Sequence, residues 1–293
     1  MEALLREGSN WGRWGPDDEL GAINLITAEK RVAAAGLVRT GRSVSLSRDF
    51  PTAPAPGNAR PAQHYLRRDR RQHGGGVALD YVGIDYHGHS CTHIDALCHA
   101  WDDRGMWNGR DPQQALTIDG ATFGTVDRWG DGITTRGVLL DVPAFRGTAY
   151  VEPGRPVTAD ELDEVAEAQG TVPEAGDALV VYSGRDRFEA EHGPWGGAPE
   201  RPGLDASCVR FLGDHDVSVL AWDMMDAFPH RFEVPWTVHA AIFALGVALV
   251  DNCELGPLAQ VCEAEARREF MLVTAPLVIP GGTGSPVNPL ALF

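Results

Sequence analysis

The stretch that says most about this chain is His89-Ser-Cys-Thr-His93-Ile-Asp95-Ala-Leu-Cys-His99. Its three histidines and its aspartate are separated by even numbers of residues, so an extended backbone would direct all four side chains to one side. The β-branched Thr92 and Ile94 favour a strand over the first half. Imidazole nitrogens and a carboxylate from one short segment suit Zn²⁺, Mn²⁺ or iron. Burying these groups without partners would cost several kcal/mol, so a metal site is favoured over unrelated histidines.

A second candidate piece of the site lies far downstream. His239 and Asp251 flank the apolar run 240–250. The pattern predicts a helix over 235–245, its end at Gly246 and a buried strand over 247–250. From these residues alone, the ordinary interpretation is favoured over a site: His239 as a partly exposed helix residue and Asp251 as a turn-forming aspartate.

The rest of the chain predicts alternating helices and strands. Helices are expected over 159–169, after a capping box that starts at Thr158, over 205–212, ended by Gly213, and over 257–268. Strands are expected over 137–142, 178–182, 217–222 and 270–279. The alternation favours a mixed α/β fold, and no linker-like segment divides the chain, so we expect one domain over 1–293. The loop 281–286 is interpreted as a turn, because it lacks the ending of a phosphate-binding P-loop.

Composition excludes several classes of partner. Lys and Arg number 25 against 41 Asp and Glu, for a formal net charge of −16. This balance argues against nucleic acid and anionic membrane surfaces, which need a basic footprint. The five cysteines show no CxxC spacing, which disfavours a disulfide framework or a zinc ribbon. No signal-peptide pattern and no apolar run near ~20 residues is present, so we expect a cytoplasmic protein that does not contact the membrane.

With both pieces in view, the sequence resembles the metal-dependent cyclase family, which includes bacterial kynurenine formamidase and isatin hydrolase. The family pattern His-x-Gly-Thr-His-x-Asp-x-Pro-x-His is matched at the required spacing by His89, Thr92, His93, Asp95 and His99. Cys91 stands in place of the pattern's Gly and Leu97 in place of its Pro, and neither is a ligand position. The stretches 21–24, 107–109, 137–141 and 281–286 also resemble one branch of the family.

The resemblance implies a fold and a set of site residues. The fold is the single-domain mixed β/β/α swivelling fold of the family, assembled at least as a homodimer. The implied metal ligands are His89, His93, Asp95, His239 and Asp251. In the family a Glu follows the later His by twelve residues; here that place is taken by Asp251, which keeps the carboxylate but shortens its reach. His99 matches the catalytic acid/base.

The implied activity is that of a metal-dependent hydrolase acting on a small molecule. A bound Zn²⁺ or Mn²⁺ would supply hydroxide to an amide, formamide, cyclic imide or lactone carbonyl, with His99 moving the proton. No Gly-x-Ser-x-Gly motif is present, which disfavours a serine hydrolase. Two other enzymes remain open: a cyclase or aromatase acting on a polyketide, and a non-haem iron oxygenase using His93, Asp95 and His239. Metal binding without catalysis is a third alternative, but it would need no acid/base beside the ligands.

Overall fold

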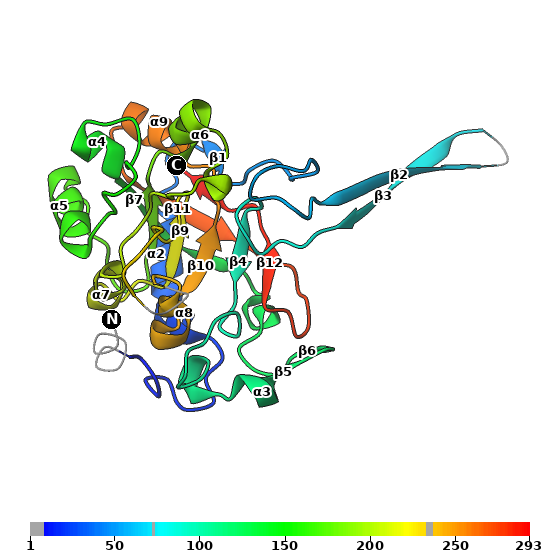
Figure 1. Ribbon diagram of the computed structural model, residues 1–293, viewed down its shortest axis with the longest axis horizontal. Helices are drawn as coiled ribbons and strands as arrows, with labels where there is room; N and C mark the ends of the chain where they lie inside the picture. The colour runs from blue at the N-terminus through cyan, green and yellow to red at the C-terminus, as the bar shows by residue number, and fades with distance from the viewer. Residues whose placement is uncertain (1–8, 72–73, 233–236) are drawn as a thin grey trace.

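The computed structural model describes residues 9–71, 74–232 and 237–293, and its centre is a nine-stranded sheet (Figure 1). The strand order is β1-β13-β11-β7-β8-β9-β10-β4-β12. The central strands β7, β8, β9 and β10 are parallel, and the strands on either side of them are antiparallel. The bounds are β1 Ser43–Ser45, β4 His93–Asp95, β7 Ile133–Asp141, β8 Ala178–Tyr182, β9 Val219–Trp222, β10 Ala248–Asp251, β11 Glu269–Thr274, β12 Gly284–Pro286 and β13 Leu290–Leu292.

Apolar residues alternate along the central strands and build a core on each face of the sheet. On one face Leu140, Leu179 and Leu220 pack in a cluster with residues of the α5, α7 and α8 helices. On the other face Leu139 and Val180 pack in a cluster with residues of α9. The α-helices are α2 Ala28–Ala35, α3 Pro112–Ala115, α4 Val142–Arg146, α5 Ala159–Gln169, α6 Arg185–His192, α7 Cys208–Asp214, α8 Ala240–Leu245 and α9 Gly256–Ala264. Short 3₁₀ helices are η1 Gly21–Leu25, η2 Trp107–Gly109, η3 Val126–Trp129 and η4 Trp195–Gly197.

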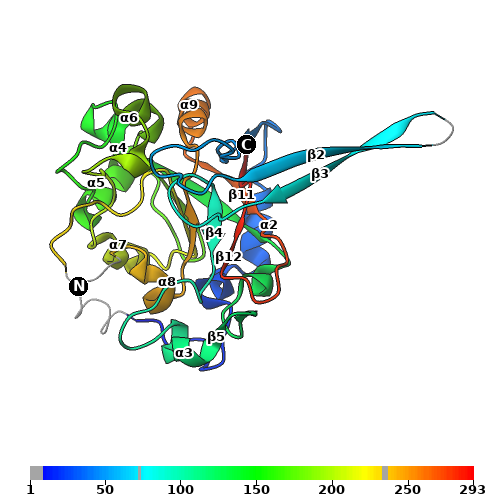
Figure 2. The same cartoon turned by 45° about the vertical axis from the view of Figure 1, so that its right-hand side comes forward.

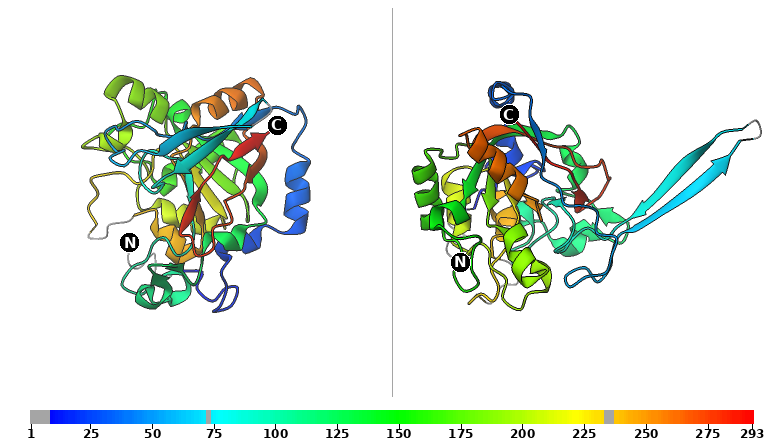
Figure 3. Two further views of the ribbon diagram at one scale, coloured as in Figure 1. Left: turned by 90° about the vertical axis from the view of Figure 1, so that its right-hand side faces the viewer. Right: turned by 90° about the horizontal axis from the view of Figure 1, so that it is seen from above.

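One element leaves the body of the molecule. The strands β2 (Gln63–Arg70) and β3 (Gly76–Gly83) pair only with each other and project as a long arm (Figures 1 and 2). The right-hand view of Figure 3 shows the arm standing away from the sheet and its helices, whereas the left-hand view looks along it. Every residue of β2, and all of β3 but its last, is exposed. The arm returns to the body just before His87, so it is joined directly to the segment that carries the histidines.

Several local predictions are confirmed. The helix expected over 159–169 is α5, where the Thr158 hydroxyl accepts from the Glu161 amide and Gly170 ends the helix in a left-handed conformation. The strand expected over 178–182 is β8, with the same bounds. Gly246 ends α8 with φ 73°, and the buried strand after it is β10. The expected start of α8 at Pro235 lies outside the described residues, and the described helix begins at Ala240.

Three boundaries were predicted wrongly. Gly213 does not end α7, which runs from Cys208 to Asp214; the left-handed residue after it is Asp216. The strand expected over 270–279 ends at Thr274, because Pro276 lacks the amide hydrogen that would continue the ladder. The loop expected over 281–286 is a turn only at its start, since β12 pairs with β4 as an edge strand that tolerates a proline. The other predicted helices and strands are present with shifted ends.

Among the described residues, no helix combines the length and the apolar character that crossing a bilayer requires.

Candidate metal centre

The pairing of β4 with β10 gathers three acidic and imidazole side chains on one face of the sheet. His93 lies directly opposite Asp251, and Asp95 lies two residues further along β4. Directly opposed residues and residues two apart share a face, so these three side chains point the same way. Ile94 and Val250 point to the other face and are buried in the core there. The alternation along β4 thus places Ile94 in the hydrophobic core and His93 and Asp95 in a polar site on the opposite face.

The ligand atoms of His93, Asp95 and Asp251 lie within 4.8 Å of one another. His93 Nε2 is 3.4 Å from Asp95 Oδ1 and 4.0 Å from Asp251 Oδ2. His93 Nδ1 donates to the Cys91 carbonyl at 2.9 Å, which leaves Nε2 facing the carboxylates. Neither oxygen of the fully buried Asp95 accepts a hydrogen bond of good geometry from the described residues. A buried carboxylate left in this state is costly, and a divalent cation fits the nitrogen and oxygen donors around it.

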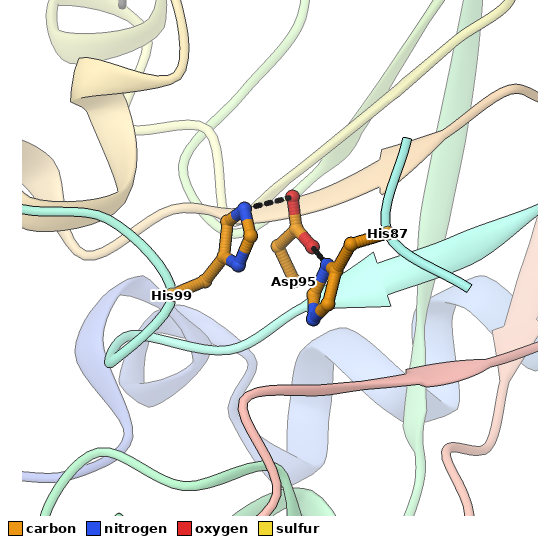
Figure 4. Close-up of side chains that lie close together, drawn as sticks. All are labelled: His87, Asp95 and His99. Carbon is orange, nitrogen blue, oxygen red and sulfur yellow. Dashed lines mark ion pairs between the residues drawn. The ribbon is translucent and has the colours of Figure 1, made fainter. Parts of the chain in front are cut away.

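Asp95 also belongs to a second group of possible ligands, with His87 and His99. Figure 4 shows its carboxylate between the two imidazoles. His87 Nδ1 lies 2.9 Å from Asp95 Oδ1, and His99 Nε2 lies 3.8 Å from Asp95 Oδ2. The two rings stack with centroids 4.1 Å apart, and His87 Nε2 lies 3.0 Å from the Thr283 hydroxyl. The motif that identified His99 did not include His87, whose only sequence indication is its place two residues before His89.

His239 reaches the same face from the start of α8. Its Nε2 is 3.1 Å from Asp251 Oδ2 and 3.9 Å from Asp95 Oδ2. Its Nδ1 bonds to Asp226, which also accepts from the amides of Thr237 and Val238 at 3.0 and 2.6 Å. This arrangement, in which a carboxylate orients an imidazole toward a metal site, is common in metalloproteins.

The contact with Asp226 changes the protonation of both groups. Burial alone would lower the pKa of His239, but the charges of Asp226 and Asp251 outweigh burial and raise it well above its usual value. Burial alone would raise the pKa of Asp226, but the charge and hydrogen bond of His239 hold it well below its usual value. Sequence analysis missed Asp226. Its position shortly after the buried β9 strand is the only feature that could have pointed to it, because such positions often line sites in α/β sheets.

These side chains line a cavity of about 370 Å³, within the range of small-molecule sites. His89 lines this cavity too, but its ring lies edge-on to Trp195, 5.4 Å away, and it belongs to neither group of ligand atoms. Burial, helped by the positive charges of Arg201 and Arg185, lowers the pKa of His89 to about 4. Burial also lowers the pKa of His99 to about 4, against the opposing charge of Asp95.

The backbone explains why the four residues of the motif do not all face one way. It is extended only from His93 to Asp95, and a turn closed by a bond from the His99 amide to the Ala96 carbonyl, 2.9 Å, follows. His89 lies in a bend over 87–91. The prediction of one extended segment therefore holds for His93 and Asp95 alone, and the turn returns His99 to the side of Asp95.

Two buried side chains from other elements fix that bend. Arg185, at the start of α6, donates to the His89 carbonyl at 2.6 Å and to Asn252 Oδ1 at 2.7 Å. Asn252 donates to the carbonyls of Gly88 and Cys91 at 2.7 and 3.0 Å. Both ends of the bend are thus held by hydrogen bonds from residues that lie far away in the sequence.

The fold and the site together place this chain in a known class. A family model described as "Putative cyclase" matches residues 43–227, and the chain belongs to this family. A crystal structure of a protein described as a novel cyclase is 29% identical, covers 99% of each chain and superposes with a TM-score of 0.88. The expected mixed β/β/α fold of the cyclase family is thereby confirmed.

More distant structures share this fold. An isatin hydrolase bound to the product analogue thioisatinate is 17% identical, with 91% of this chain and 99% of that chain covered and a TM-score of 0.63. A predicted metal-dependent hydrolase from Bacillus stearothermophilus is also 17% identical, with 85% and 97% covered and a TM-score of 0.55. Among curated proteins, no sequence matches the chain.

Proposed function

We propose that the protein is a metal-dependent hydrolase that opens an amide, formamide, cyclic imide or lactone carbonyl of a small molecule. The observation that carries the proposal is the buried carboxylate of Asp95, which accepts no hydrogen bond of good geometry from the described residues and lies beside His93 and Asp251 at the wall of a cavity. Family membership supports it, and the names of the isatin hydrolase and the metal-dependent hydrolase that share the fold point to the same chemistry.

A divalent metal, Zn²⁺ or Mn²⁺, would be held by His93, Asp95 and Asp251, with His239 completing the site. His89 stays the further ligand that the sequence predicts, and His87 is the alternative that the geometry offers. When bound, such a metal lowers the pKa of water toward ~7 and polarises a carbonyl oxygen.

His99 is the proposed acid/base. Its side chain is 22% exposed and lines the cavity, so it can reach a substrate while it contacts Asp95. A neutral imidazole there accepts a proton from the attacking water and returns it to the leaving nitrogen or oxygen.

The test combines metal analysis with hydrolysis. Aryl formamides, cyclic imides, isatin and lactones are screened with Mn²⁺ and with Zn²⁺. We expect His93→Ala and Asp95→Ala to lose both metal and activity. His99→Ala should keep most of its metal and lose activity by about 10²–10⁴-fold.

The matched control is His192→Ala, a half-exposed histidine on α6, which should change neither quantity. Full metal occupancy in both the His93 and the Asp95 variants, measured by elemental analysis, contradicts the proposed site. Loss of metal from the His99 variant in proportion to its activity would make His99 a ligand instead.

We also propose that the protein is a homodimer or larger assembly in which the β2–β3 arm contacts a second copy. An isolated two-stranded hairpin is marginally stable in water, yet this arm carries exposed apolar side chains, including a stacked pair, Tyr65 and Tyr81, with centroids 5.7 Å apart. Residues 63–83 hold four arginines and two aspartates, a net charge of +2, which leaves −18 on the rest of the chain. The arm is therefore attracted to the body of another copy.

Replacing 67–79 by an Asn-Gly turn, which joins the paired residues Leu66 and Asp80, tests this assembly. We expect light scattering to show a dimer or larger for the intact chain and a monomer for the shortened one. A monomeric intact chain, or an unchanged mass after shortening, contradicts the proposal.

The cytoplasmic location expected from the sequence stays a prediction. One domain over 1–293 is likewise proposed, supported by the pairing of β1 with β13 from the two ends of the chain.

A further inference from the structure

Among the described residues that line the cavity there is one arginine, Arg201. Its guanidinium lies over the rings of Trp195 and Phe228, 5.7 and 4.7 Å from their centroids. Its backbone exchanges two hydrogen bonds with that of Phe228, at 2.8 and 2.9 Å. The Trp195 indole is fixed in turn by a bond from Nε1 to the Pro202 carbonyl at 2.8 Å. The arginine is thus held in place by packing.

The Asp226 carboxylate acts on this charge electrostatically, but it forms no ion pair with Arg201. Within residues 9–71, 74–232 and 237–293, Arg201 forms no ion pair, and its buried Nε has no hydrogen-bond partner. Two other arginines near the site differ, because Arg185 and Arg48 each pair with Glu189 at 2.8 Å. Asp226 lines the same cavity but is engaged by His239. Leaving a partly desolvated cation without an ion pair is unfavourable, so an anion bound in the cavity would stabilise the Arg201 guanidinium.

We propose that Arg201 binds a carboxylate of the substrate, so that the enzyme acts on small anionic amides, imides or lactones in preference to neutral ones. The inference rests on the proposed hydrolase function and specifies its substrate class. A guanidinium is the side chain best suited to a carboxylate, because its planar fork donates two parallel hydrogen bonds. Arg201 and the group formed by His93, Asp95 and Asp251 line one cavity, so one small molecule can engage both.

A binding experiment tests the subsite without requiring turnover. Benzoate and its neutral counterpart benzamide are titrated into the full chain, once loaded with Mn²⁺ and once treated with a chelator. We expect benzoate to bind about tenfold or more tightly than benzamide in both preparations. Arg201→Met, which keeps an unbranched side chain between the rings, should weaken benzoate binding by about 10- to 100-fold and leave benzamide within about twofold.

The controls separate the arginine from other causes. Arg187→Met removes a charge from an exposed position on α6 and should change neither affinity. Arg201→Lys keeps the charge but loses the fork, so it should fall between the parent and Arg201→Met. Benzoate binding that disappears with the metal and is unaffected by Arg201→Met would assign the carboxylate to the metal site and overturn the proposal.

A kinetic experiment distinguishes failure of the subsite from failure of the function. Formanilide and 4-formamidobenzoate contain the same scissile formamide and differ by a carboxylate. For the anionic substrate we expect Arg201→Met to raise KM about 10- to 100-fold with kcat largely kept, and for formanilide neither constant should change. Equal kcat/KM for both substrates in the parent enzyme overturns the proposal while the hydrolase function stands. Absence of hydrolysis of any screened substrate counts against the function, and the benzoate titration then decides the subsite on its own.

Discussion

Replacing Asp226 by Asn should weaken the metal site although Asp226 is not one of its proposed ligands. Asp226 Oδ1 accepts from the amides of Thr237 and Val238, and Oδ2 bonds to His239 Nδ1. The asparagine carbonyl can keep the two amide bonds. Its NH₂ group then stands where Oδ2 accepted the imidazole proton, so two donors face each other.

The expected loss of metal affinity follows from how His239 must change its protonation to relieve the contact between the two donors. Moving its proton to Nε2 places a hydrogen on the nitrogen that lies 3.1 Å from Asp251, where a metal would bind. Loss of such an orienting partner typically costs 10- to 100-fold in metal affinity. A charged hydrogen bond replaced by an opposed pair of donors costs roughly 1.5–3 kcal/mol of stability, or roughly 3–10 °C in Tm for a chain of this size.

Competition with a chromophoric chelator measures the affinity for Zn²⁺ and Mn²⁺, and thermal unfolding in EDTA measures stability apart from metal. Asp160→Asn is the control, since that side chain is 86% exposed.

The pKa of Asp226 is held below its usual value near 3.8, so the stabilisation that Asp226 contributes is present above about pH 4 and is lost as the pH falls below it. The difference in Tm between parent and variant should therefore shrink below pH 4. A metal affinity within twofold of the parent would refute the role assigned to Asp226.

Three further predictions concern other parts of the structure. Asp251→Asn should weaken metal binding at least tenfold while Trp222 Nε1 keeps an acceptor, which lies at 2.5 Å; affinity within twofold of the parent and intact activity would remove Asp251 from the site. Gly137→Ala would place a methyl group 2.3 Å from the fully buried Phe270 ring, so urea unfolding should show a loss of about 1–3 kcal/mol, and an unchanged midpoint would contradict it. Thr158→Ala should cost about 1 kcal/mol through loss of the α5 cap and leave metal binding unchanged; no shift in the unfolding midpoint would be the contrary result.

The parts of the fold that sequence analysis predicted well are those with local causes. The hydroxyl of Thr158 and the glycine at 170 determine α5 from both ends, and an uninterrupted apolar run determines β8. Boundaries failed where the cause is not local. Pairing with β4 makes 284–286 a strand, and nothing within those residues indicates that pairing. The arm of β2 and β3 was missed because none of its exposed apolar side chains faces a core of this chain.

The candidate site likewise contains residues placed by local spacing and residues placed by contacts distant in the sequence. This difference affects which histidine is proposed as a metal ligand. His93 and Asp95 share a face because they are two apart on a strand, which the spacing alone predicts. His89 was placed with them by the same even spacing, but that argument requires an extended backbone between residues 89 and 93. Arg185 and Asn252 instead hold a bend there through bonds to backbone carbonyls. That bend gives His87 the contact with Asp95 and leaves His89 beside Trp195. Side chains from α6 and from the residue after β10 therefore determine which of the two histidines lies beside Asp95. A variant such as Arg185→Met would release the bend, and His89 could then take the place of His87 as a metal ligand.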